Sequence, residues 1–81
     1  MSDTSEARRC VAGYNQFVKL VRKGKAEKVY LASDADVFFE RAVRSELVAT
    51  PEVGLDVTRS ASQLAEFAGV EVPTAVITIP K

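Results

Sequence analysis

The sequence predicts a single-domain α/β protein, a three-layer α/β/α sandwich built on a mixed sheet of about four strands. Two patterns carry this prediction. Short runs rich in Val and Ile alternate with segments whose apolar residues recur at helical spacing. Such alternation is typical of helices that cover both faces of one sheet. The 81 residues suffice for one domain, and we expect residues 1–7 to form a frayed start or a short helix.

The first half of the chain is predicted to form two strands joined by a helix. Residues 9–12 are short and apolar enough for a small strand. Residues 14–23 carry apolar side chains at helical spacing with basic residues on the other side. Gly24 follows the last turn, where a left-handed helix end favours glycine. Residues 28–32 form a compact apolar run that is typical of a central strand.

A second helix is predicted to follow the turn at residues 33–36. Asp34 and Asp36 offer carboxylates that can cap its first turn. Two carboxylates at this spacing could also hold Mg²⁺ together with a phosphate, but no third acid lies nearby in sequence, which favours capping. The apolar face of this helix is expected to comprise Phe38, Phe39, Ala42, Val43 and Leu47. Of the aromatic residues Tyr14, Phe17, Phe38 and Phe39, we expect all but Tyr14 to be core residues rather than a stacking platform.

The second half is predicted to add a loop, a strand, a helix and a final strand. Pro51 and Gly54 break regular structure and indicate a loop. The alternating residues 55–58 indicate a strand. A third helix is expected to begin after the capping residue Ser60 and to end at Gly69. The last strand is expected at residues 74–79, between Pro73 and Pro80.

Composition argues against an enzyme. The chain has one cysteine, no histidine and no tryptophan. Without histidine, the commonest general base and the usual zinc ligand sets are missing, and no Gly-rich loop followed by Lys-Ser/Thr is present to hold a phosphate. We therefore expect no catalytic residues, no metal and no cofactor. Cys10 cannot form an internal disulfide, which fits a reducing compartment, and its apolar surroundings favour a buried structural thiol over one activated by Arg8 and Arg9.

Neither a membrane span nor a secretory signal is visible. No apolar run approaches the roughly 18 residues that a spanning helix needs. The chain opens acidic and polar, unlike a secretory signal. We expect a cytoplasmic protein with no membrane partner.

Charge is unevenly distributed along the chain, although the formal net charge is zero. Residues 8–28 contain seven basic residues and one acid, a balance of +6, whereas residues 34–71 contain three basic residues and eight acids, a balance of −5. This asymmetry indicates one face that attracts anions and one acidic, solvated face. The alternative is that the charges simply scatter over the surface.

The segment at residues 13–16 is the strongest candidate for a binding site. It lies at a predicted strand-to-helix junction, where backbone N–H groups without helical partners can bind phosphate. Asn15 and Gln16 add amides that can donate to and accept from base edges, and Lys19 follows one turn later. Alone, the segment could equally be a glycine turn followed by an Asn cap.

Its context resembles a known family. Residues 13–19 and 23–36, and then the segments at 60–64, 69–72 and 75–77, are similar to the kink-turn-binding ribosomal proteins (large-subunit proteins seven-Ae and thirty-e and their small bacterial relatives). Those proteins pair a Gly-x-Asn-Glu or Gly-x-Lys-Gln helix start with a downstream Lys, a basic-Gly helix end, and an apolar strand that runs into Asp-x-Asp. The resemblance covers about residues 10–79.

The resemblance implies an α/β/α sandwich that recognises sharply bent, internally looped RNA. In the family, the helix-start segment reads sheared purine pairs, which assigns this role to Gly13, Asn15 and Gln16, with Lys19 on the phosphates. Tyr14 is bulkier than the usual residue there and could stack on a base or obstruct one. The family's apolar loop packs against an extruded nucleotide, and the matching residues are Val72, Pro73 and Thr74. Further phosphate pairing is expected from Arg22, Lys23 and Lys28.

Two functions follow as alternatives. The first is a monomeric, non-catalytic RNA-binding protein, either associated with the ribosome or regulating RNA. The second is an interaction module of the same fold that has lost RNA affinity and binds a protein through its acidic side. The first is the leading hypothesis, and the second gains support from the zero net charge and from the departures from the family pattern at Ala65 and Pro73.

Overall fold

The computed structural model describes residues 10–71 and 73–81. The expectation for residues 1–7 therefore lies outside the described residues, as do Arg8, Arg9 and Val72. Seven elements follow one another along the chain: β1 (Val11–Ala12), α2 (Tyr14–Arg22), β2 (Ala26–Leu31), α3 (Val37–Leu47), β3 (Gly54–Asp56), α4 (Ala61–Ala68) and β4 (Val76–Pro80). The predicted alternation of strands and helices is confirmed.

The four strands form one mixed sheet in the order β1-β4-β2-β3. The last strand, β4, lies in the interior and pairs antiparallel with both β1 and β2, whereas β2 and β3 are parallel. Since β1 and β2 are both antiparallel to β4, they run in the same direction. The helix that follows each of them therefore begins at the same end of the sheet.

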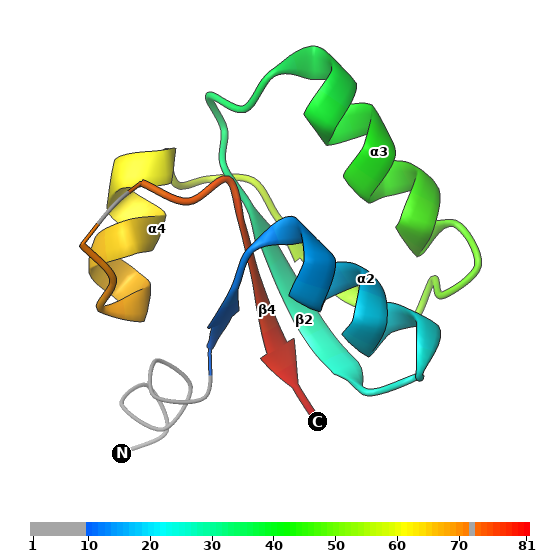
Figure 1. Cartoon of the computed structure of the whole chain (residues 1–81). Coiled ribbons are helices and arrows are strands. Elements are labelled where there is room, and N and C mark those ends of the chain that lie inside the picture. Colours follow the sequence, from blue (N-terminus) through cyan, green and yellow to red (C-terminus); the bar gives the residue numbers. More distant parts are fainter. Residues whose placement is uncertain (1–9, 72) are drawn as a thin grey trace.

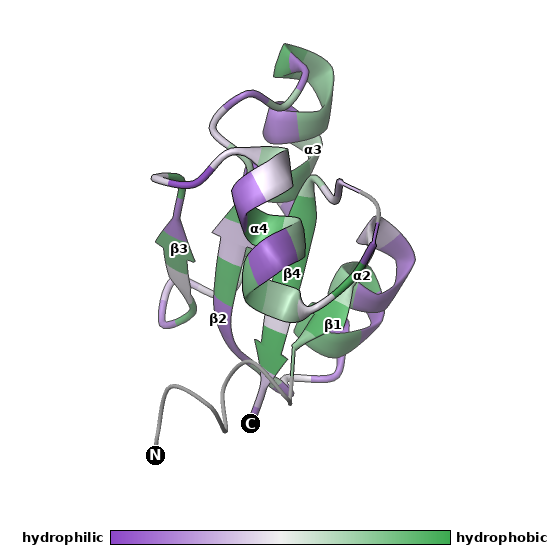
Figure 2. Cartoon of the chain, turned by 90° about the vertical axis from the view of Figure 1, so that its left-hand side faces the viewer, coloured by the Kyte–Doolittle hydropathy of each residue, from purple (hydrophilic) through white to green (hydrophobic). Residues whose placement is uncertain are grey.

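Helices cover both faces of the sheet (Figure 1), with α2 and α3 on one face and α4 on the other. Figure 2 looks onto the α4 face. Alternate residues of β2 face opposite layers: Val29 and Leu31 pack with α2 and α3, and Tyr30 packs with Leu64 of α4. The predicted three-layer sandwich is confirmed.

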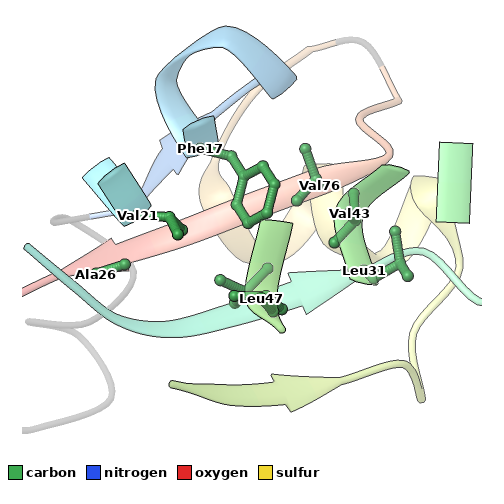
Figure 3. Packing of buried hydrophobic residues seen from close by; sticks show 8 residues of the cluster. Phe17, Val21, Ala26, Leu31, Val43, Leu47 and Val76 are labelled. Carbon is green, nitrogen blue, oxygen red and sulfur yellow. The ribbon is translucent and has the colours of Figure 1, made fainter. Parts of the chain in front are cut away.

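The larger core lies between the sheet and the pair α2 and α3 (Figure 3). Phe17 and Val21 of α2 meet Val43 and Leu47 of α3 over the apolar side of β2 and β4. Phe17 and Val43 are fully buried, so this layer fixes α2 and α3 relative to each other. A second cluster, on the other face, anchors α4 through Leu64.

Helix ends follow the sequence chemistry closely. Gly24 and Gly69 have the positive φ angles expected after α2 and α4, 70° and 73°. Ser60 caps α4 in a reciprocal capping box, because its side chain accepts from the Gln63 N–H while the Gln63 side chain accepts from the Ser60 N–H. Asp36 caps α3 by accepting from the Phe38 N–H at 2.9 Å.

The structure differs from the sequence prediction in three features. The last strand, expected at residues 74–79, spans Val76–Pro80 and so includes Pro80. Phe38 was expected in the core, but 73% of its surface is exposed, while its neighbour Phe39 packs against the core. Adjacent residues on a helix point about 100° apart, so only one of this pair can face inward. The strand predicted at residues 55–58 instead spans Gly54–Asp56. The strand ends there because the Asp56 carboxylate accepts from the N–H and the hydroxyl of Thr58, two residues further on, at 2.9 and 2.6 Å. This local bond forms a turn in place of further strand pairing.

Candidate functional site

One end of the sheet gathers the start of α2, the loop between β2 and α3, and the loop that leads into β4 (Figure 1). Backbone hydrogen bonds hold these segments together. The Gly13 N–H donates to the Val76 carbonyl at 3.1 Å, and the Ala32 N–H donates to the Ala75 carbonyl at 2.8 Å. The Thr74 N–H reaches the Ala61 carbonyl at 3.4 Å. Sequence segments from both halves of the chain therefore meet at this end.

Gly13 sets the start of α2. Its backbone, with φ 106° and ψ 149°, lies in a region that is essentially restricted to glycine. Gly13 is also the N-cap residue and has no side chain to cap the helix. The first-turn N–H groups of α2 therefore stay open to an outside acceptor such as a phosphate oxygen. The alternative of an Asn cap is wrong, because Asn15 lies inside the helix.

The predicted polar side chains of α2 surround this helix start. Asn15, Gln16 and Lys19 are all exposed. Lys19 is one turn beyond Asn15 on the same side of the helix. Lys23, also exposed, forms the C-cap and lies about 12 Å further along the axis than Asn15. Two amides and one ammonium group thus lie around a set of open N–H groups.

Tyr14 is half-buried rather than freely exposed. Its ring lies 5.7 Å from the Phe17 ring and 5.5 Å from the Phe39 ring, measured between centroids. The first residue of α2 is therefore fixed against the first turn of α3. Since this packing takes up much of the ring, Tyr14 is better placed to orient the helix start than to hold a base on its face.

Arg22 is paired with an acid of α3. Its guanidinium donates to both carboxylate oxygens of Glu46, with Nε–Oε1 at 3.3 Å and Nη2–Oε2 at 3.0 Å. The hydrogen bond from Arg22 lowers the pKa of the Glu46 carboxyl, and the same bond raises the pKa of Arg22. The positive charge of Arg22 is therefore shared with Glu46, whereas Lys19 and Lys23 have no ion pair among the described residues.

Lys28 lies on a different face from α2. It alternates with Val29 along β2 and thus shares the α4 side of the sheet with Tyr30. Its Nζ lies 4.9 Å from the centre of the Tyr30 ring. On the same side, the Arg59 guanidinium lies 5.3 Å from the Tyr30 ring and 4.9 Å from the Phe67 ring. The structure therefore does not bring Lys28 together with Lys19 and Lys23.

The loop before β4 contributes Pro73 and Thr74 to the same end of the sheet as Gly13. Pro73 is exposed. The Thr74 hydroxyl donates to the Val76 carbonyl at 3.1 Å, and Val76 in turn accepts from Gly13. This chain of bonds fixes the loop beside the start of α2. The third predicted loop residue, Val72, lies outside the described residues.

The two acids after β2 cap two different helices. Asp36 caps α3, as expected. Asp34 instead accepts from the Ala61 N–H at the start of α4, at 2.9 Å. Both carboxylates therefore act as helix caps, which is the interpretation the sequence favoured.

Between residues 10 and 81, Val72 aside, no group of three or more His, Cys, Asp or Glu side chains could hold a metal ion. The helices in the same part of the chain include none long and apolar enough to cross a bilayer.

Sequence reasoning missed one surface residue near this end of the sheet, Phe38. Its exposure could have been found from the Phe38–Phe39 pair, since the Asp36 cap fixes the helix start and Val43 and Leu47 define the buried side. Phe39 precedes these by four and eight residues and so shares their side, whereas Phe38 does not.

These features define a class of protein, a small α/β/α sandwich that presents a glycine-preceded helix start at one end of its sheet. Residues 1–81 match the Ribosomal protein L7Ae/L30e/S12e/Gadd45 family, and the chain belongs to that family. Among solved structures, a Giardia lamblia 15.5kD RNA binding protein is 32% identical with a TM-score of 0.77, over 98% of this chain and 68% of that one.

A second solved structure supports the fold alone. It is described as a protein with unknown function from Bacillus halodurans C, and it is 24% identical with a TM-score of 0.79, over 93% of this chain and 74% of that one. No curated protein matches the chain.

Proposed function

We propose that this protein is a non-catalytic RNA-binding protein that recognises a kink-turn or a similarly bent internal loop, as a cytoplasmic monomer that associates with the ribosome or regulates RNA. One observation carries the proposal: the open start of α2, with Asn15, Gln16 and Lys19 exposed around it, lies beside the loop of Pro73 and Thr74. Membership of the ribosomal protein family, and an RNA-binding protein among the similar structures, support it.

The chemistry of this end of the sheet suits RNA. Amides can pair with exposed base edges, backbone N–H groups can bind a phosphate oxygen, and Lys19 can neutralise a neighbouring phosphate. A regular A-form helix hides its base edges in a deep, narrow groove. A bent loop splays its bases and brings phosphates close together, so one helix start can contact both. Pro73 and Thr74 would then support an unstacked nucleotide on the other side.

A net charge of zero does not conflict with RNA binding, because the charge near the start of α2 is positive. Lys19 and Lys23 lie on α2 without an ion pair among the described residues, while Arg22 is neutralised in part by Glu46 and adds longer-range attraction. Lys28, on the α4 face, would act only through this longer-range field. Screening limits such attraction to roughly 8–10 Å at physiological salt, so the charges near the helix start matter more than the total.

The alternative, a protein-interaction module, finds less support on the surface. Val37 and Val48 are exposed on α3, 52% and 79%, but they lie about 16 Å apart along the helix axis. Between them, Arg41 and Arg44 are also exposed. Val37 and Phe38 are exposed side by side at the start of α3, but Arg41 and Arg44 separate them from Val48, so these residues do not form the continuous apolar patch that marks many protein interfaces.

Two substitutions test the site. Asn15→Ala removes an exposed amide and Lys19→Ala an exposed ammonium group, and neither side chain belongs to the core. We expect each to weaken binding to a kink-turn RNA by about tenfold, in line with one lost hydrogen bond to a polar or charged group. The control is Lys25→Ala, which removes the same charge from the opposite end of the sheet and should change affinity far less.

Thermal melting of each variant checks the fold. All three variants should melt close to the unsubstituted protein, because all three side chains are exposed. If Asn15→Ala and Lys19→Ala bind as tightly as Lys25→Ala, the start of α2 is not the RNA contact.

A further inference from the structure

One side of α3, here called its flank, contacts α2 through Phe39 and Glu46. Glu46 of α3 bonds Arg22 of α2, and Phe39 of α3 meets Tyr14 of α2. Contacts at both ends of the helix pair show that α2 and α3 run alongside each other in the same direction. Phe38 is turned about 100° from Phe39 and about 80° from Glu46 around the helix, on the side away from the buried Val43. It therefore lies in the first turn of α3 at the solvent-exposed edge of this flank.

The matching flank of α2 carries the candidate RNA contacts. Asn15, Lys19 and Arg22 follow the i, i+4, i+7 pattern and share a side of the helix. Since Glu46 holds Arg22, this side is the one next to α3. Asn15 and Phe38 therefore lie at corresponding positions, in the first turns of two adjacent helices.

Phe38 is the only exposed aromatic ring among residues 10–71 and 73–81, with 73% of its surface open. The groups around it are unevenly charged. Arg41, one turn further along α3, and Lys19, across on α2, are exposed and have no ion pair in the described part of the chain. Asp36 caps the helix start on the other side of Phe38, where its carboxylate accepts from the Phe38 N–H.

We propose that Phe38 stacks on an unpaired base of the bound RNA, with Arg41 and Lys19 neutralising the adjoining phosphates. The proposal rests on the function proposed above and extends the RNA contact from α2 onto α3. An aromatic face flanked by cations is what single-stranded segments require, because every base has a π-face and every nucleotide a phosphate. The charge of Asp36 directs the phosphates toward Arg41 and Lys19. The two unpaired cations favour an anionic partner, and the aromatic ring favours one with flat, unstacked bases.

Three substitutions at Phe38 separate stacking from other contacts. Phe38→Ala removes the ring, Phe38→Leu keeps an apolar side chain without a π-face, and Phe38→Trp keeps a stacking face. The probe is a kink-turn RNA with unpaired loop nucleotides, titrated at a fixed salt concentration. We expect Phe38→Ala to lose about fivefold to 150-fold in affinity, Phe38→Leu to lose nearly as much, and Phe38→Trp to bind like the unsubstituted protein.

Val48→Ala is the matched control. Val48 is also exposed and apolar on α3 but lies at its far end, away from Asn15. It should leave RNA affinity unchanged. A second, direct readout uses 5-iodouridine in the loop of the same RNA, since irradiation joins this base to an aromatic ring stacked on it. Peptide mapping should find the adduct at Phe38.

The outcomes distinguish this inference from the proposed function. If the protein binds the RNA and Asn15→Ala weakens it, but Phe38→Ala and Phe38→Leu bind normally, the stacking role is wrong and the proposed function stands. Normal binding by Phe38→Leu alone would overturn stacking in favour of plain apolar packing. A protein partner lost with Phe38→Ala while RNA affinity is unchanged would assign Phe38 to a protein interface instead. Absence of RNA binding by the unsubstituted protein would overturn both proposals.

Discussion

Arg22 and Glu46 form a two-point ion pair that joins the last turns of α2 and α3, with Nη2–Oε2 at 3.0 Å and Nε–Oε1 at 3.3 Å. The side chains differ in exposure, 69% for Arg22 and 21% for Glu46. Glu46 is thus the more enclosed partner, and it engages the charge of Arg22 although that side chain is largely exposed. The pair therefore links the packing of two helices to the charge of the candidate RNA surface.

Releasing Arg22 should strengthen RNA binding. In Glu46→Gln the carboxylate is lost, so Arg22 becomes available to a phosphate and the local charge rises by one. We expect affinity for a kink-turn RNA to increase by a few-fold, and the dependence of log affinity on log salt to steepen by about one phosphate contact. Titrations at several salt concentrations measure both. Weaker binding by this variant would show that Glu46 helps to position the RNA surface.

Acid should destabilise the protein below about pH 4.5. The pKa of Glu46 lies below its ordinary value of 4.5 because of the hydrogen bond from Arg22, and the pKa of Asp56 lies below 3.8 chiefly because of the bond from the Thr58 hydroxyl. A carboxyl with a lowered folded-state pKa contributes its full stability above the unfolded-state value, and that stability is lost as pH falls through the folded-state pKa.

Urea unfolding of Asp56→Asn at pH 7 and pH 3 tests whether the stability that Asp56 contributes is lost in acid. The variant should be less stable than the unsubstituted protein at pH 7. The difference should shrink at pH 3, below the ordinary pKa of 3.8, because the unfolded chain there takes up a proton that the folded carboxylate resists. A difference that stayed constant over this range would mean that Asp56 contributes through its shape and not through its charge.

Gly13→Ala should cost stability although there is room for the added methyl group. No atom lies within 4 Å of where the new Cβ would be, so the penalty is one of backbone conformation, about 1–3 kcal/mol in the free energy of unfolding. Gly54→Ala is the control, because its added Cβ would make only an ordinary contact, 3.6 Å to Cγ of Lys28, and it should change stability by about 0.5 kcal/mol or less. Equal effects at the two sites would contradict the backbone argument.

Thr78→Val should stabilise the protein. Thr78 is fully buried in β4, and its hydroxyl oxygen has no hydrogen-bond partner among residues 10–71 and 73–81. Valine has nearly the same shape without the unpaired hydroxyl, so the free energy of unfolding should rise by about 1 kcal/mol. Thr78→Ser keeps the hydroxyl and loses a methyl group, so its free energy of unfolding should fall by a similar amount. If the Thr78→Val variant is less stable than the Thr78→Ser variant, the Thr78 hydroxyl makes a stabilising hydrogen bond in the folded protein.

Much of the fold could be predicted because local chemistry and tertiary structure agree. Gly24 and Gly69 end helices, Ser60 and Asp36 cap them, and the apolar residues of α2 face the core. The last strand was found, but its interior place between β1 and β2 was not, since strand order depends on long-range pairing that periodicity does not encode.

The candidate site was predictable in part. A motif at residues 13–19 identified the helix start, and the structure places its polar side chains at the surface. The sequence did not show that Lys28 lies on the α4 face, apart from the α2 cations, because that placement follows from the alternation along β2. The pairing of Arg22 with Glu46 joins residues 24 positions apart, and only the packing of α2 against α3 brings them together.

The most direct test of the central claim is a titration of the purified protein against a kink-turn RNA and a straight RNA duplex of equal length, at two salt concentrations. The account predicts tighter binding to the bent RNA at both concentrations, with affinity that falls as salt rises. Equal affinity for the two RNAs, or no binding even at low salt, would contradict it and leave the family fold without the proposed recognition.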